Sequence, residues 1–171
     1  IAFTEASDHG CMSITVHSRE IDIPVVPNAR HLGGHQTASG RRTAAEDVVR
    51  AGGLQGLTDA GAVALRERGI TMIVDLRYEQ ERIEFPTPDV VRHGIHTHVA
   101  PVFQQDASPV GLDTEFTGFH DVYARFLESG RDAYRLLVEV IANEQGGVLF
   151  HCSAGKDRTG VGAAILLSLA G

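Results

Sequence analysis

This 171-residue sequence has one lysine, two cysteines and no tryptophan. With only two cysteines, Cys11 and Cys152, the chain has no disulfide framework. No apolar run approaches the ~20 residues needed to cross a bilayer. A formal net charge of −7 leaves no overall positive field, which argues against nucleic acid or an anionic membrane surface as the main partner. Any site for an anion must therefore be local.

The single lysine indicates where such a site could be. Among 15 basic residues only Lys156 is a lysine, and it lies in the stretch HCSAGKDRTG, residues 151–160. This stretch follows a short apolar run and precedes an apolar segment. A buried strand, a glycine-containing loop and a helix are therefore predicted in that order.

Strand and helix patterns alternate along most of the chain. Apolar runs between turn residues are typical of buried strands, and apolar spacings of three and four residues are typical of helices. Such alternation predicts a single α/β domain over residues 1–171, in which helices cover both faces of a central, largely parallel sheet. The predicted strands are one or two within 13–26, then 70–76, 95–99 and 148–150; the predicted helices are 58–68, two that meet at Ser129-Gly130, and 159–170; the predicted loops are 33–40, 85–89 and 104–113.

Ligands of such sheets bind beyond the carboxyl ends of the parallel strands. Cys152 follows one predicted strand, and Asp75 and Arg77 lie at the end of another. We therefore expect these side chains to lie near one crevice.

The predicted helix over 159–170 is apolar on most sides. A helix with such a surface is normally covered by other parts of a protein. We expect the cover to come from C-terminal helices that this chain lacks or from a second copy in a homo-oligomer.

The residues that follow Cys152 are suited to phosphoryl chemistry. A thiolate forms where a helix N-terminus, N–H groups and cations stabilise its charge. The loop can turn its N–H groups toward one anion, Gly155 permits a close backbone approach, and the guanidinium of Arg158 could hold two phosphoryl oxygens. The interpretation is attack of sulfur on phosphorus followed by hydrolysis of a phosphocysteine, with no cofactor and no metal. The candidate phosphate-binding residues are Ser153, Ala154, Gly155, Lys156, Asp157 and Arg158.

The stretch 151–160 resembles the signature of the protein tyrosine phosphatase superfamily, which is His-Cys, five residues, Arg, then Ser or Thr. Its form HCxAGKDRTG is similar to that of a bacterial branch that includes secreted mycobacterial phosphatases acting on phosphotyrosine, other phosphoproteins and phosphoinositides. Most of the chain shares the resemblance. Further matches are Asn28-Ala29-Arg30-His31-Leu32-Gly33-Gly34, Leu57-Thr58, Gly69-Ile70, Val74-Asp75-Leu76-Arg77 and Glu81-Arg82. The sequence departs from the branch at Ala29, His31 and Ala51, where Phe, Asp and Ser are usual.

This resemblance implies a three-layer sandwich of the cysteine-phosphatase type, with Cys152 as the nucleophile and Arg158 as a phosphate ligand. It implies dual specificity, with a phosphorylated protein, a small phosphomonoester or a phosphoinositide as the substrate. A phosphate or sulfate ion could occupy the loop. The source is expected to be bacterial, with both the cytoplasm and secretion open as locations.

The same resemblance indicates which residue would donate a proton to the leaving group. The sequence has no tryptophan, so the Trp-Pro-Asp loop of conventional tyrosine phosphatases is absent. In the bacterial branch the aspartate of the phosphate loop is thought to substitute, which nominates Asp157. Asp75 and Asp121 are reserve candidates, and Asp157 could instead only stabilise the N-terminus of the helix. His151 and Thr159 are expected to support the site.

Several other residues have ordinary interpretations. His96 and His98 would share one face of a strand, but no further ligand with matching spacing accompanies them and His93, so no metal site is predicted. Tyr123 belongs to a helical apolar stripe, which favours core packing over a place in a pocket wall. Cys11 is expected to be a spectator thiol rather than a redox partner.

Two functions other than a phosphatase stay open. A rhodanese-like sulfurtransferase also presents one loop cysteine before a helix. A phosphate-binding module without catalysis would keep the loop but lack a working acid or pocket, which the departures at Ala29, His31 and Ala51 allow. Cysteine-dependent hydrolysis of phosphomonoesters is the leading interpretation.

Overall fold

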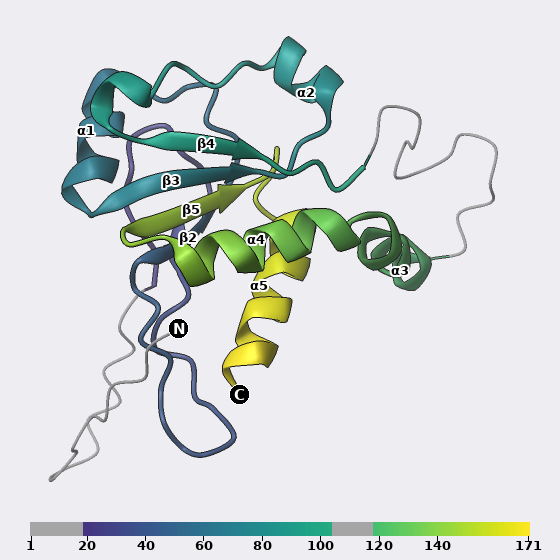
Figure 1. Cartoon of the computed structure of the whole chain (residues 1–171). Coiled ribbons are helices and arrows are strands. Elements are labelled where there is room, and N and C mark those ends of the chain that lie inside the picture. Colours follow the sequence, from purple (N-terminus) through teal and green to yellow (C-terminus); the bar gives the residue numbers. More distant parts are fainter. Residues whose placement is uncertain (1–18, 104–117) are drawn as a thin grey trace, which may run out of the picture.

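A computed structural model describes residues 19–103 and 118–171. In this part of the chain five strands form one sheet in the order β1-β2-β5-β3-β4 (Figure 1). The pairing of β1 with β2 is antiparallel, and the other three pairings are parallel. The strands are β1 (Arg30–His31), β2 (Val48–Ala51), β3 (Ile70–Asp75), β4 (His96–Val99) and β5 (Gly147–His151).

Helices cover both faces of this sheet, so the predicted α/β architecture with a largely parallel sheet is confirmed (Figure 1). On one face lie α3, α4 and α5, and on the other lies α1. The helices are α1 (Asp59–Glu67), α2 (Glu79–Glu84), α3 (Phe119–Ser129), α4 (Arg131–Asn143) and α5 (Asp157–Ala170), with a 3-10 turn, η1, at Val91–His93.

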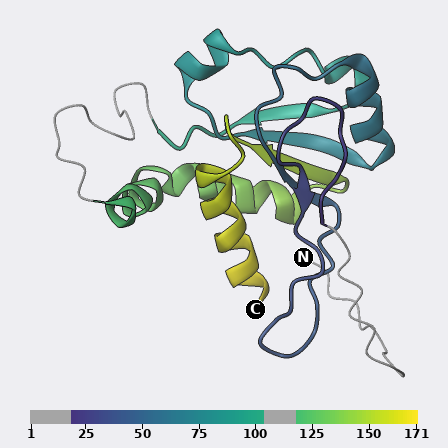
Figure 2. The same ribbon diagram turned by 180° about the vertical axis from the view of Figure 1, so that it is seen from behind.

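Successive side chains of β5 point to opposite faces of the sheet, so this strand contributes to two separate apolar cores. Val148 and Phe150 pack in the core that Leu137 of α4 also enters. Leu149 points to the opposite face and belongs to the core that contains Leu65 of α1. The segment 19–29 runs in front of the sheet in Figure 2 and adds its buried apolar side chains to this second core. Two independent apolar layers therefore hold β5 rigidly at the centre of the sheet.

The predicted helices over 58–68 and 159–170 are confirmed, and the two predicted around Ser129-Gly130 are α3 and α4. Thr58 caps α1 as expected, because its hydroxyl accepts the N–H of Gly61 at 3.2 Å. The sequence did not predict β1, β2 or α2. Of the segment 13–26, only residues 19–26 are described.

The prediction of strand structure is wrong for residues 19–26. This part of the chain contributes only an isolated bridge between Glu20 and Arg30. Pro24 interrupts the segment, and a proline has no N–H for a strand ladder. Val25 has a φ of 61°, which is incompatible with extended backbone. The remainder of that predicted segment and the predicted loop over 104–113 lie outside the described residues.

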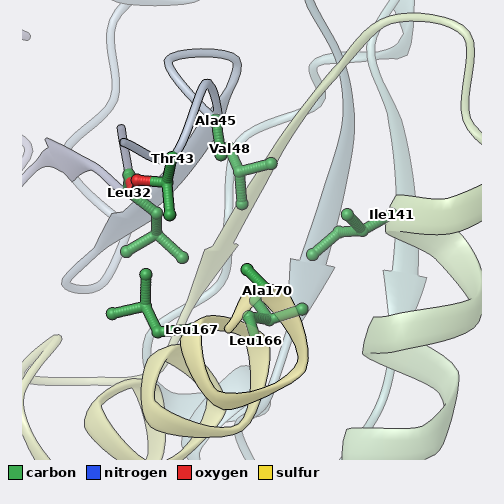
Figure 3. A pocket seen from close by; sticks show the side chains of 8 residues that line it. All are labelled: Leu32, Thr43, Ala45, Val48, Ile141, Leu166, Leu167 and Ala170. Atoms are coloured by element: carbon green, nitrogen blue, oxygen red, sulfur yellow. Dashed lines mark hydrogen bonds between the residues drawn. The ribbon is translucent and has the colours of Figure 1, made fainter. Parts of the chain in front are cut away.

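The C-terminal half of α5 is only partly covered. Leu166 and Ala170 are buried, whereas Leu169 is 65% exposed. A small apolar cavity opens beside this end of the helix (Figure 3). The residues that line it are Leu32, Thr43, Ala45, Val48, Ile141, Leu166, Leu167 and Ala170. The hydroxyl of Thr43 donates to the carbonyl of Leu32 at 2.7 Å, so the cavity offers no convergent polar groups for an anion.

Within the described residues, no helix combines the length and the hydropathy needed to cross a bilayer.

Candidate active site

Three parallel strands end at the same edge of the sheet. His151, the last residue of β5, is paired in register with Ala51 of β2 and with Asp75 of β3. The loop that begins at Cys152 leaves the sheet at this edge and leads directly into α5. Asp75 and Cys152 therefore lie at a common edge, as the sequence predicted.

Four successive carbonyl groups of this loop are bound by residues that are distant in the sequence. Their donors come from the turn before β1, from β2, and from the segment that follows β2. The contacts are Gly53 N–H to Ser153 O (2.8 Å), Asn28 Nδ2 to Ala154 O (2.8 Å), and Arg50 Nη2 to Gly155 O (2.8 Å) and Lys156 O (3.1 Å).

These contacts fix the direction of the loop N–H groups. The described backbone contains no cis peptide bond, and a trans peptide places its N–H opposite its carbonyl oxygen. The N–H groups of residues 154–157 therefore face away from the residues that bind the four carbonyls. The first N–H groups of α5 follow directly, and these have no acceptor within a helix. Successive N–H groups directed away from such anchors form a concave site for an anion.

Gly155 is required by this conformation. Its φ is +68°, in the region that residues with a side chain rarely adopt. A Cβ atom at this position would lie 2.5 Å from the nitrogen of Gly52 and 2.7 Å from the carbonyl oxygen of Ala51. The loop thus rests directly on the backbone that follows β2, where no side chain fits.

Cys152 lies beneath the loop, with 2% of its surface exposed. Its Sγ is 3.4 Å from Oγ1 of Thr159, a fully buried residue of α5, so a hydroxyl contacts the sulfur. Burial raises the pKa of Tyr134, and charge on Cys152 raises it further. Tyr134 and Arg158 are therefore both close enough to the sulfur to respond to its charge.

Arg158 forms a two-pronged ion pair with Glu81 of α2. Its Nη1 donates to Oε2 at 2.6 Å and its Nη2 to Oε1 at 2.7 Å, and both side chains are more than four-fifths buried. The hydroxyl of Ser153 also donates to Glu81, and the N–H of Tyr78 donates to Oε2 at 3.2 Å. Glu81 therefore connects the start of α2 to both ends of the phosphate-loop candidate.

The contacts of Glu81 and Arg158 favour the charged form of each side chain. Burial works to raise the pKa of Glu81, but the hydrogen bonds from Arg158 and Ser153 outweigh it and hold that pKa below its ordinary value. Burial works to lower the pKa of Arg158, but the bonds to Glu81 and the charge of Cys152 raise it instead. Both groups are thus fully ionised near neutral pH.

Asp157 is the first residue of α5, and its carboxylate is bound by a tyrosine. The hydroxyl of Tyr123 on α3 donates to Oδ1 of Asp157 at 2.6 Å. Tyr123 is 36% exposed, so the prediction that it packs in the core is wrong. The helical stripe is real, but Tyr123 lies at its edge, where the ring contacts Phe126 and the hydroxyl extends to α5.

Asp75 is directed toward a buried arginine. Its carboxylate accepts Nε of Arg77 at 3.0 Å and Nη2 at 2.7 Å, and Arg77 is 1% exposed. Burial works to raise the pKa of Asp75, but the bonds from Arg77 and the nearby His151 lower it. Asp121, the other reserve candidate for the acid, lies 3.4 Å from Nδ1 of its neighbour His120 on α3.

His151 is fully buried behind the loop. Its Nδ1 is 3.2 Å from the carbonyl oxygen of Cys152, and its Nε2 is 3.6 Å from Oδ2 of Asp75. Burial lowers the pKa of His151. A carbonyl and a carboxylate can only accept, so each ring nitrogen faces an acceptor. His151 therefore fixes the backbone at the cysteine rather than reaching the loop's open side.

The remaining predicted residues occupy the rim of the loop. Ser153, Ala154 and Lys156 are exposed, and the carbonyl of each is among the four that are bound from behind. In the described ranges, no group of three or more histidine, cysteine, aspartate or glutamate residues could hold a metal ion.

Three contributors to the site received no role from the sequence. Asn28 and Glu81 fall within stretches that resemble the phosphatase branch, so a signal was present without a function attached to it. Arg50 lies on the unpredicted strand β2, and nothing in the local pattern connects it to a loop 105 residues away. Pairing of β2 with β5 creates that contact.

Comparison with known proteins relates this geometry to one family. A family model described as "Tyrosine phosphatase family" matches residues 21–171. A tyrosine-protein phosphatase of Nostoc commune is 35% identical over 132 residues, which is 74% of this chain and 44% of the relative. The triple specificity protein phosphatase PtpB of Mycobacterium tuberculosis is 29% identical over 154 residues, covering 72% of this chain and 55% of the relative. The chain thus spans about half the length of these relatives.

Proposed function

Because the chain belongs to the tyrosine phosphatase family, we propose that it is a cysteine-dependent phosphatase that hydrolyses phosphomonoesters through a phosphocysteine intermediate. Phosphotyrosine is the first substrate class of the proposal. Phosphoserine, phosphothreonine and phosphoinositides are included because the sequence resembles the bacterial branch described above, and one relative carries the name triple specificity protein phosphatase.

The observation that carries the proposal is the set of four loop carbonyls bound from behind. Their anchoring directs the N–H groups of residues 154–157 away from Asn28, Arg50 and Gly53. A tetrahedral phosphate dianion fits such a concave arrangement at the start of a helix. Arg158 supplies a positive charge at the same place.

The first chemical step transfers the phosphoryl group to sulfur. The Cys152 thiolate attacks phosphorus in line with the ester oxygen, forming the S–P bond as the P–O bond breaks. The loop N–H groups and Arg158 stabilise the charge on the three other oxygens. Asp157 donates a proton to the departing oxygen, so the product leaves as a neutral alcohol or phenol.

The second step regenerates the enzyme. The Asp157 carboxylate accepts a proton from water as the water oxygen attacks phosphorus, and the S–P bond breaks. Inorganic phosphate and the Cys152 thiolate are the products. The hydroxyl of Thr159, 3.4 Å from Sγ, is positioned to donate to the thiolate as it leaves.

Replacement of the nucleophile tests the proposal. Cys152→Ser should abolish turnover of 4-nitrophenyl phosphate and leave binding of inorganic phosphate intact, since the loop N–H groups and Arg158 stay in place. Thr43→Ser, in the remote apolar cavity, is the control variant for handling and folding. Undiminished turnover by Cys152→Ser would overturn the proposal.

The other two functions are distinguished in the same experiment. Transfer of sulfur from thiosulfate to cyanide by the wild type, without phosphatase activity, would identify a sulfurtransferase. Phosphate binding by the wild type without hydrolysis of any aryl phosphate between pH 5 and pH 8 would identify a binding module.

A further inference from the structure

The carboxylate of Asp157 accepts a hydrogen bond that its position at the start of a helix does not explain. A carboxylate in the first turn of a helix is stabilised by the helix dipole alone. Here the hydroxyl of Tyr123, from a different helix, also donates to Oδ1 at 2.6 Å. The bond to Asp157 is the largest cause of the raised pKa of Tyr123, so the phenol keeps its proton at neutral pH.

The ring of Tyr123 is held by other aromatic residues. Its centroid is 5.6 Å from that of Phe126, at an interplanar angle of 84°. Phe126 in turn packs against Phe103 with a centroid distance of 5.1 Å, and both phenylalanines are buried. Aromatic rings prefer the edge-to-face arrangement that Tyr123 and Phe126 adopt, so this contact favours one orientation of the Tyr123 ring. The hydroxyl is thus presented to Asp157 from a ring that packs against the buried Phe126.

This contact determines which carboxyl oxygen can carry a proton. A phenol that donates to Oδ1 fits a carboxylate. In a carboxylic acid the carbonyl oxygen is the stronger acceptor, so the same bond favours Oδ1 as the carbonyl oxygen. The proton of the acid form is therefore directed to Oδ2. A general acid must present its proton within hydrogen-bond reach of the leaving oxygen, so a fixed carboxyl plane favours the transfer.

We propose that Tyr123 is a positioning residue for the general acid: its hydroxyl binds Oδ1 of Asp157 and orients the protonated Oδ2 toward the leaving group. This inference rests on the proposed function, because it gives Tyr123 a role only if Asp157 donates the proton. It also places α3 in the active site, although α3 carries no residue of the phosphate loop.

Substrates with different leaving groups test the proposal. When the acid works, phenol leaves as a neutral molecule and its acidity matters little; without the acid, a phenolate must leave. Tyr123→Phe should therefore lower kcat/KM about tenfold for phenyl phosphate and about twofold or less for 4-nitrophenyl phosphate, whose phenol is far more acidic. The ratio kcat/KM is used because it reports only the steps through cleavage of the P–O bond.

Tyr134→Phe is the matched control. Tyr134 also donates a phenolic hydrogen bond in this region, but to the carbonyl of Arg158 at 3.2 Å rather than to Asp157. Any loss in Tyr134→Phe should affect both substrates by the same factor. A selective loss as large as that of Tyr123→Phe would overturn the proposal, because selectivity would then not require contact with Asp157.

The double variant completes the test. In an Asp157→Asn background, Tyr123→Phe should cause no further selective loss for phenyl phosphate, because the acid is already absent. An equal loss for both substrates in the single variant, or a selective loss that persists in the double variant, would overturn the inference. These results differ from failure of the proposed function, which would appear as turnover by Cys152→Ser.

Discussion

Glu81 and Arg158 lie 77 residues apart in the sequence and meet through two parallel hydrogen bonds of 2.6 and 2.7 Å. Such a planar pair fixes the guanidinium in both position and orientation. Glu81 thus sets the geometry of the cation that the proposed reaction uses to hold phosphate. The first two predictions test this relationship.

Replacing Glu81 should weaken phosphate binding. Glu81→Gln keeps the shape of the side chain but loses the charge and one acceptor, so Arg158 is no longer held in one orientation. We expect the Kd for inorganic phosphate, measured by calorimetry, to rise about tenfold. Glu84→Gln, on the exposed side of the same helix, is the control. Tighter binding by Glu81→Gln would contradict the prediction, because the carboxylate would then be a competitor of phosphate.

The same pair should make folding stability depend on pH. The pKa of Glu81 lies below its ordinary 4.5 in the folded protein, so the unfolded chain takes up this proton at a higher pH. The stabilisation is complete above the unfolded value and is lost as the pH falls through the folded value.

Denaturant unfolding of the wild type and Glu81→Gln between pH 3 and pH 6 measures the effect. The difference in their free energy of unfolding should shrink below about pH 4.5. Glu84→Gln is measured in parallel to separate the effect of removing a carboxylate from α2 in general. A difference that grows toward low pH would have the wrong sign and would reject the assignment.

Gly155→Ala should damage the loop more than an alanine at another left-handed glycine. At Gly155 the new Cβ meets backbone atoms of Gly52 and Ala51 at 2.5–2.7 Å, in addition to the unfavourable φ. Gly34 has a φ of +82° with nothing within 4 Å of its Cβ position, so Gly34→Ala pays only the conformational cost of about 1 kcal/mol.

Thermal unfolding and phosphate binding of the two alanine variants provide the comparison. We expect Gly155→Ala to lose at least about 2 kcal/mol of stability together with phosphate affinity. Equal losses in the two variants would show that the contact with the backbone after β2 is unimportant.

The buried Asp75–Arg77 pair should be worth far more than an exposed pair of the same residue types. Asp75→Asn leaves the guanidinium of Arg77, 1% exposed, without its counter-charge. We expect a loss of about 3–5 kcal/mol in the free energy of unfolding. Asp59 pairs with Arg92 where both side chains are more than half exposed, so Asp59→Asn should lower the free energy of unfolding far less. Similar losses in urea unfolding would contradict the prediction.

The sequence predicts the parts of this fold that depend on local pattern. Val148–Phe150, the loop and the helix after it follow from one apolar run, a glycine and a second apolar run. Thr58 indicates the start of α1 because its hydroxyl accepts a nearby N–H. These signals act within a few residues, so tertiary contacts do not change them.

The contacts that complete the candidate site are not local. Arg50 and Asn28 reach the loop only because β1 pairs with β2 and β2 pairs with β5. For Tyr123, helical spacing identifies the side of α3 that faces the protein. It does not show that this residue lies at the edge of that side, within reach of Asp157. Such relationships require the packing of whole elements.

The anchors of the loop have a consequence for how the proposed activity is gained and lost. Asn28 and Ala154 are separated by 126 residues, and Arg50 and Gly155 by 105. Contacts of this span close large loops and form late in folding. A nick in the exposed stretch 38–42 between β1 and β2 would separate Asn28 from the rest of the chain, so it should weaken the anchoring of the loop while leaving Cys152, Arg158 and α5 chemically intact. The loop would reach its phosphate-binding geometry only after Asn28 and Arg50 have packed against Ala154 and Gly155.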